Sequence, residues 1–354
     1  MFDLLILVAV ILGLIAIAKV IQVLELANNV KGTSSYIVSE KDNRTQARLM
    51  PVFLISYFAF IIWQVVKWGD EMLPVSASEH GVVIDQLMNI TWMIIIPVFI
   101  LTHIALFYFA WKYAYDKNRK AQFYAHNSKL EMLWTSIPAL VLLILILYGL
   151  SVWGDVMAPL TEEDDPIEIE LYSRQFDWTA RYPGEDGVFG KSDVRLIAGV
   201  NMLGLDSTDE NAWDDKYVKA EFHIPVNRSV QFYFRSQDVI HSAYMPHFRA
   251  QMNCVPGMIT QFNFKPTITT AEMREITGNP EFAYYLLCNK VCGAAHYNMK
   301  MEIIVESEED YNNWMNEQKE FMEYGKYSFS NEKNDINKEV LAKSTEAETK
   351  NSAL

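Results

Sequence analysis

The stretch CNKVCGAAHYNM, residues 288–299, decides how the C-terminal half of this chain is interpreted. It holds two of the three cysteines, four residues apart, then a histidine four residues later and a methionine three after that. The apolar run FAYYLL precedes it and MEIIVE follows it, so these side chains are predicted to lie on one loop between two strands. A loop on a rigid sheet can hold a set of ligands in place. The spacing therefore predicts a metal site in a β domain.

The donor atoms in this stretch favour copper. Thiol, imidazole and thioether groups together form a soft ligand set, which suits copper. A disulfide between Cys288 and Cys292 is an alternative in an oxidising compartment, but it leaves His296 and Met299 unexplained. A structural zinc site prefers four Cys or His ligands and rarely uses a thioether. The spacing between the cysteines is CxxxC, which does not indicate covalent haem attachment.

The two thiols suggest more than one copper ion. A single blue-copper ion takes one Cys, two His and a weak axial Met, so this loop offers one thiolate too many. A second thiolate can bridge, and two bridging sulfurs can hold two copper ions, each of which needs a terminal imidazole. His296 supplies one imidazole. The second has to come from His223, His241 or His247.

The N-terminal half of the chain contains four long apolar runs, at residues 4–23, 51–66, 93–111 and 133–153. Each meets or approaches the roughly 20 residues that a helix needs to cross a bilayer core about 30 Å thick. They predict four transmembrane helices. The first run also resembles a signal peptide, because AIA looks like a cleavage site, but its start carries Asp3 and no basic residue, which favours a retained helix.

Charge sets the orientation of these helices. Residues 28–50 and 114–132 each carry four Lys or Arg, whereas residues 69–86 carry none. By the positive-inside rule the two basic loops are cytoplasmic, so the N-terminus and everything after Trp153 lie outside. Residues 151–354 hold 19 basic and 34 acidic residues. An acidic extracytoplasmic domain is expected.

Short β-type runs replace the long apolar blocks after residue 155. They are rich in Val, Ile, Tyr and Phe and are separated by Pro, Gly and Asn, which predicts an antiparallel sandwich or barrel. The runs are IEIELYS, FDWTARY, YVKAEFHI, RSVQFYFRS, MITQFNF, FAYYLL and MEIIVE. Residues 307–327 predict a polar helix, and residues 328–354, with few apolar side chains, a disordered tail.

Two motifs in order resemble subunit II of cytochrome c oxidase, the carrier of the binuclear CuA centre. They are Asp238-Val-Ile-His241-Ser and the set Cys288, Cys292, His296 and Met299. The match extends to Pro246, Pro256, Gly257, RQFDWTARY (residues 174–182) and EMLWTSIPAL at the start of the last helix. The resemblance covers residues 90–306 and implies an α+β membrane protein, with four transmembrane helices followed by an extracytoplasmic cupredoxin-like all-β barrel and a polar tail.

The resemblance divides the chain into four parts. Residues 1–89 hold two transmembrane helices that the usual two-helix subunit lacks, and residues 90–155 form the transmembrane hairpin. Residues 156–306 form the cupredoxin CuA domain, and residues 307–354 the polar helix and tail. The implied location is the bacterial cytoplasmic membrane, as a multi-pass protein with its N-terminus and CuA domain on the periplasmic side.

The metal ligands follow from the same resemblance. It implies that the bridging thiolates are Cys288 and Cys292 and that the terminal imidazoles are His241 and His296. The thioether ligand would be Met299, and the remaining weak ligand the backbone carbonyl of Lys290. His223 and His247 have no family role and are expected as surface or hydrogen-bonded histidines. Cys254 is expected as a buried thiol, and His103 as a helix-packing residue.

The chain departs from the family at several positions. Lys290 replaces a Glu that usually also serves a Mg or Mn site shared with subunit I, so that site is in doubt. Phe176 replaces the Trp at which electrons usually enter, while Trp178 is retained, and Asn253 replaces an acidic docking residue. The acidic surplus still suits a basic donor. Glu131 matches the family Glu at the mouth of a proton channel.

The implied function is electron transfer into a haem-copper oxidase of aerobic respiration. Cytochrome c, or a haem c domain of an attached respiratory complex, gives electrons to CuA, which passes them to the haem of subunit I for reduction of oxygen to water. Haems and CuB are expected only in subunit I of this proton-translocating oxidoreductase, and the isolated chain is an electron-transfer module. Subunit I, other oxidase subunits and membrane lipid are the expected partners, without nucleic acid.

Two alternatives remain. A quinol oxidase subunit of the same fold lacks copper, but the five side-chain ligands retained here argue against it. A membrane-anchored copper carrier would store the metal at a similar Cys and Met site, yet it does not need a second imidazole from the distant DVIHS motif.

Overall fold

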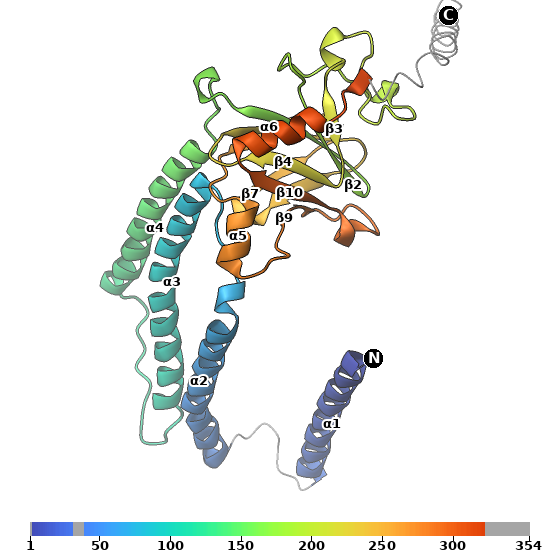
Figure 1. The fold of residues 1–354 in the computed structure, drawn as a ribbon. Coiled ribbons are helices and arrows are strands. Elements are labelled where there is room, and N and C mark those ends of the chain that lie inside the picture. Colours follow the sequence, from blue (N-terminus) through green and yellow to red (C-terminus); the bar gives the residue numbers. More distant parts are fainter. Residues whose placement is uncertain (1, 31–38, 323–354) are drawn as a thin grey trace, which may run out of the picture. The chain divides into compact units, whose positions relative to one another are not determined.

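Four long helices precede the β domain in the computed structural model, which describes residues 2–30 and 39–322 (Figure 1). They are α1 Phe2–Val30, α2 Glu40–Trp68, α3 Glu79–Lys112 and α4 Ser128–Val156. Within the described residues, α2, α3 and α4 are long and apolar enough to cross a membrane. Three predicted spans are thus confirmed. Residues 4–23 do form a helix, and its membrane span stays a prediction.

Ser39 marks the start of α2, and His103 of α3 packs against α2. The Ser39 hydroxyl accepts a hydrogen bond from the Asp42 backbone N–H at 3.1 Å, which caps the first turn. In α3 the ring of His103 lies 4.1 Å from that of Phe99 and stacks at 5.6 Å on that of Tyr57 in α2. His103 is therefore a helix-packing residue, as predicted.

The β domain consists of two five-stranded sheets. One has the strand order β3-β2-β1-β5-β8 and the other β4-β10-β9-β6-β7. The strands are β1 Ile167–Arg174, β2 Asp177–Tyr182, β3 Lys216–Val218, β4 Glu221–Pro225, β5 Val230–Ser236, β6 His241–Met245, β7 Ala250–Cys254, β8 Thr260–Phe264, β9 Tyr284–Cys288 and β10 Lys300–Glu306. This is the sandwich that the short β-type runs predicted.

The sandwich core follows from alternation along the strands. In β10, Met301, Ile303 and Val305 are buried while the residues between them are partly exposed. Not every pair is antiparallel, however, because β1 pairs with β5 and β4 with β10 in parallel register. The run YVKAEFHI is also divided between the two sheets as β3 and β4, with Ala220 in the left-handed conformation at φ 71° between them.

Two further helices cover the sandwich. α5 Thr270–Thr277 contacts β10, and α6 Glu308–Glu317 contacts β4 (Figure 1). α6 confirms the first part of the polar helix predicted for residues 307–327 and ends at Glu317, and the Ser307 hydroxyl caps it. Its Trp314 stacks on His223 at 3.9 Å between ring centroids. Residues 323–354, which include the predicted tail, lie outside the described residues.

The loop between α2 and α3 is built into the β domain. Residues 73–91 belong to the same compact unit as residues 136–322. Ala77 donates its backbone N–H to His247 O at 2.7 Å and accepts from Thr267 N at 2.8 Å. The Ser78 hydroxyl donates to Phe248 O at 2.7 Å, and both Ala77 and Ser78 are fully buried. The loop of the additional helices therefore completes the sandwich.

Arg249 contacts both this loop and the first turns of α3. Its Nε and Nη2 each lie 2.9 Å from an oxygen of Asp85, and Nη2 also donates to Pro74 O at 2.6 Å. The Arg249 side chain is 8% exposed and that of Asp85 24%. Two parallel hydrogen bonds between a guanidinium and a carboxylate are among the stronger polar contacts in proteins.

Substituting Asp85→Asn is expected to destabilise the β domain by about 1–3 kcal/mol, because it leaves a largely buried guanidinium without its counter-charge. The apparent melting temperature of the full chain in detergent should fall by about 2–4 °C for each kcal/mol lost. Asp70→Asn, at an exposed position before the same loop, is the matched control. Equal melting temperatures for the two variants would contradict the role of the pair.

A second buried group of charges lies on the first sheet. Arg181 Nε is 2.7 Å from Glu170 Oε2, and Arg181 Nη1 is 3.0 Å from Asp215 Oδ2. All three side chains are at most 5% exposed. Burial raises the pKa of the Asp215 carboxyl to about 6, although Arg181 and the Gly190 N–H oppose that shift.

Asp215 should therefore make stability fall with rising pH. The folded state holds this proton more tightly than the unfolded state does, so the group's contribution is largest below pH 4 and is lost as the pH rises through about 6. The stability of Asp215→Asn relative to the parent protein should rise between pH 4 and 7 by about 2–3 kcal/mol at most. Chemical unfolding at several pH values measures this difference.

Asp206→Asn is the control, because hydrogen bonds from Thr208 lower the pKa of Asp206. The stability of this variant relative to the parent protein should change little between pH 4 and 7, because a carboxyl with a lowered pKa is largely ionised over this range in both the folded and the unfolded state. A stability difference for Asp215→Asn that does not change with pH would be inconsistent with the raised pKa.

Candidate metal centre

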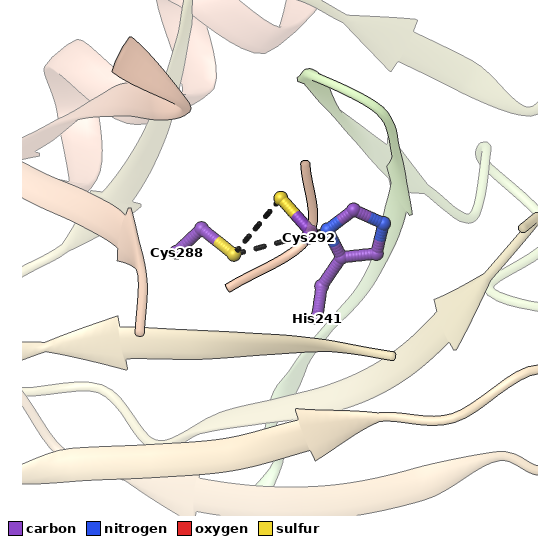
Figure 2. A group of neighbouring side chains, drawn as sticks. All are labelled: His241, Cys288 and Cys292. Atoms are coloured by element: carbon purple, nitrogen blue, oxygen red, sulfur yellow. Dashed lines mark hydrogen bonds between the residues drawn. The ribbon is translucent and has the colours of Figure 1, made fainter. Parts of the chain in front are cut away.

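Strand pairing brings the two motifs together. β6 and β9 are antiparallel neighbours in which Ala243 is paired with Cys288, so His241 at the start of β6 lies beside the end of β9. The loop after β9 carries Cys292 and then turns through a short 3₁₀ helix, η6 His296–Asn298. Figure 2 shows the His241 ring and the two cysteine sulfurs facing one another.

The predicted ligand atoms form one continuous group. Cys288 Sγ lies 3.8 Å from His241 Nδ1 and 3.9 Å from Cys292 Sγ. Cys292 Sγ in turn lies 3.6 Å from His296 Nδ1 and 3.8 Å from Met299 Sδ. The carbonyl oxygen of Lys290 is 3.2 Å from Cys288 Sγ. All six groups named from the sequence are therefore brought together.

The group is partly shielded from water. His241 is fully buried, Met299 is 2% exposed and Cys292 5%, whereas Cys288 and His296 are intermediate. Burial and the neighbouring Cys288 raise the pKa of Cys292 to about 11. The Cys292 thiol therefore keeps its proton near neutral pH unless a cation binds and displaces it.

Asp238 orients the His241 ring. His241 Nε2 lies 2.8 Å from Asp238 Oδ1, and because a carboxylate only accepts, this nitrogen carries the hydrogen and Nδ1 faces the sulfurs. Burial alone would raise the pKa of Asp238, but hydrogen bonds from Gln175 N, His241 and Val239 N outweigh it and lower that pKa. The sequence motif includes Asp238, but no role was predicted for it. The signal was a carboxylate three residues before the histidine.

Two aromatic residues lie against the group. Trp178 is 1% exposed, and its ring meets that of His241 edge to face at 6.2 Å between centroids. Phe176 packs on the backbone of Gly293, where a Cβ would lie 2.8 Å from Phe176 Cζ. Gln175 Nε2 donates a hydrogen bond to Cys292 O on the same side of the loop. Residues 175–178 thus support the ligand loop.

Substituting Gly293→Ala is expected to loosen the metal site. Gly293 has φ +145°, a conformation that side chains rarely adopt, and the new methyl would overlap Phe176 and the Gln175 amide. Copper should leave the variant faster than the parent protein when a chelator is added, with a rate increase of about 5- to 30-fold for a distortion of about 1–2 kcal/mol. Gly187→Ala is the control, because it also has positive φ but an open surrounding.

If copper leaves both glycine variants at the same rate, contact between the loop and Phe176 does not hold the site together.

The remaining candidates lie elsewhere. His223 Nδ1 is 2.6 Å from Glu306 Oε1, so it is a hydrogen-bonded histidine as expected. His247 packs edge-on against Phe282 and Tyr284, and burial lowers its pKa to about 4. Glu131, in the first turn of α4, accepts a hydrogen bond from Asn127 N at 3.3 Å. Its proton role stays a prediction.

Cys254 is a buried thiol, as predicted. It pairs with His241 across β6 and β7, is fully buried, and burial raises its pKa to about 12. Such a thiol is unreactive at neutral pH.

The donor set fits copper. Two thiols, two imidazoles, one thioether and one carbonyl converge within contacts of 3.2–3.9 Å, and the buried sulfur of Met299 lies beside Cys292. Thioether and thiolate ligands select soft ions, and imidazole is compatible with them. The geometry and the chemistry of the donors agree.

A membrane-anchored β sandwich with this donor set has known relatives. Residues 61–152 match the family described as "Cytochrome C oxidase subunit II, transmembrane domain", and residues 167–308 match "Cytochrome C oxidase subunit II, periplasmic domain". The alternative cytochrome c oxidase subunit 2 of Bradyrhizobium diazoefficiens is 36% identical over 242 residues, which cover 67% of this chain and 81% of that protein. Cytochrome c oxidase subunit 2 of Cereibacter sphaeroides is 27% identical over 250 residues, covering 68% and 77%.

Among solved structures, the periplasmic domain of subunit II of cytochrome oxidase from Bradyrhizobium japonicum is 22% identical, with a TM-score of 0.30 over 45% of this chain and 95% of that one. The fold and the relatives together define a membrane-anchored protein with a periplasmic, cupredoxin-like domain. The chain belongs to the cytochrome c oxidase subunit II family. Its relatives are subunits of cytochrome c oxidase, an oxidoreductase.

Proposed function

We propose that this chain accepts electrons from a cytochrome c, or from a haem c domain of an attached complex, at a CuA centre and passes them to the haem of subunit I. One observation carries the proposal: His241 and the CxxxC loop, 47 residues apart in sequence, meet with Sγ and Nδ1 atoms 3.8 Å apart. A copper store has no need of this preorganised second imidazole. When bound, the copper pair would take up and release single electrons.

The residues around the site would hold it in one geometry. Cys288 and Cys292 would supply the bridging thiolates, and His241, His296, Met299 and the carbonyl of Lys290 the remaining ligands. Asp238 fixes the tautomer and orientation of His241 through a 2.8 Å hydrogen bond. When the ligands stay in place as an electron is gained or lost, less reorganisation energy opposes the transfer.

Trp178 and Phe176 mark the proposed side of electron uptake. Phe176 is partly exposed and touches the ligand loop at Gly293, while Trp178 is buried against His241. A donor that docks over Phe176 is thereby separated from the ligands by one aromatic layer. The chain has a net charge of −14, and its surplus of acid after residue 150 would steer a basic donor toward this domain.

Two departures bear on the partner subunit. The Lys290 side chain is exposed and cationic, so it cannot supply the carboxylate that the family usually offers to a Mg or Mn ion shared with subunit I. Glu131 is exposed in the first turn of α4, where a partner can reach it, which is compatible with its role at a proton-channel mouth. Haems and CuB would lie in subunit I.

The full chain in detergent, reconstituted with copper, tests the proposal. Two copper ions per chain and an electron paramagnetic resonance pattern from one electron shared between two copper nuclei are expected. Cys292→Ala should lose that pattern, because it removes one bridging sulfur. Cys254→Ala is the matched control, since it also removes a buried thiol but should keep both ions and the pattern.

One copper ion with a single-nucleus pattern would instead favour a copper carrier. Absence of bound copper in a chain with the parent melting temperature would favour a quinol oxidase subunit.

A further inference from the structure

A cavity of about 280 Å³ lies where α3 begins and α4 ends, apart from the residues of the metal centre. Its walls come from both helices, from β8 and from Ser229 in the turn before β5. Both helices are long and apolar enough to cross a membrane. Because the periplasmic domain follows α4, this cavity lies at the outer boundary of the bilayer.

Charged residues line the outer end of the cavity together with the apolar Val156, Leu160 and Phe264, whereas the helix residues nearest the bilayer are apolar. Glu79 and His80 begin α3, whereas Val83 lies one turn further along it. On α4, Asp155 is near the end of the helix and Val152 is almost one turn before it. Residues three or four apart share one face of a helix, so each helix presents a polar end and an apolar stretch to the same cavity.

The polar end carries charges of both signs that are incompletely paired. Lys265 Nζ lies 3.8 Å from Glu79 Oε2, beyond hydrogen-bond distance, and these side chains are 42% and 70% exposed. Asp155 is exposed and has no ion pair within the described residues. His80 Nε2 is buried without a hydrogen-bond partner in the same part of the chain. The site therefore offers one cation, two carboxylates and an imidazole nitrogen.

We propose that this cavity binds the headgroup of a zwitterionic phospholipid that carries a primary ammonium group, such as phosphatidylethanolamine. The phosphate lies against Lys265 and the ammonium against Glu79 and Asp155, with the acyl chains along Val83 and Val152. A primary ammonium has three hydrogens to donate. The volume is just below the roughly 300–1,000 Å³ of pockets that hold whole ligands, which suits a headgroup whose chains remain in the bilayer.

Native mass spectrometry of the assembled oxidase, stripped of lipid and then returned to lipid, tests this site. The probes are phosphatidylethanolamine, phosphatidylcholine and phosphatidylglycerol with identical acyl chains. One phosphatidylethanolamine per chain should survive detergent washing, with a preference of about tenfold over the other two, because one lacks the ammonium hydrogens and the other lacks the positive charge. Equal retention of all three lipids would overturn the proposal, as would stronger retention of phosphatidylglycerol.

Substitutions locate the bound lipid. Asp155→Asn and Lys265→Gln should each reduce its retention severalfold, while Glu163→Gln, at an exposed acid outside the cavity, should not. Copper content measured on the same samples shows that the periplasmic domain is folded and keeps this test independent of electron transfer. Unchanged retention in both cavity variants, with copper intact, would mean that the lipid binds elsewhere.

Discussion

The pairing of β6 with β9 is the constraint on which the candidate metal centre depends. It aligns Ala243 with Cys288, so that a histidine at the start of one strand faces a cysteine at the end of the next. A slip of one residue would turn His241 to the other face of the sheet. The buried neighbours of this strand pair, on β7 and β10, hold the register because their side chains alternate between core and surface.

The residues around the candidate ligands hold them in place through specific contacts. Asp238 hydrogen-bonds the His241 ring, and Gln175 hydrogen-bonds the backbone carbonyl of Cys292. Trp178 packs edge to face against the His241 ring. These three residues belong to the first sheet or to loops that leave its strands, and each contacts a candidate ligand residue of the second sheet or of the loop after β9. The space between the sheets is therefore closed on the side that carries the centre, which limits how far the ligands can move.

The helices that the usual two-helix subunit lacks are α1 and α2. The segment that follows them makes direct contacts with the periplasmic domain. The loop after α2 enters the sandwich at Ala77 and Ser78, and its Pro74 carbonyl accepts a hydrogen bond from Arg249. Arg249 itself has φ 52°, an uncommon conformation for a side-chain-bearing residue, and its buried guanidinium also pairs with Asp85 at the start of α3. The additional segment therefore contributes to the stability of the periplasmic domain as well as to membrane anchoring.

The sequence alone predicted the helices, most of the strands and the candidate ligand residues. Apolar runs of about 20 residues and alternating β-branched runs are local signals, and Cys288, Cys292, His296 and Met299 lie within one loop. The tertiary structure decided what depends on distant pairing. The short strands β6 and β7, the parallel pairs, the role of Asp238 and the contact between Asp85 and Arg249, 164 residues apart, have no local signal. They arise because burying both sheets brings distant segments into one register.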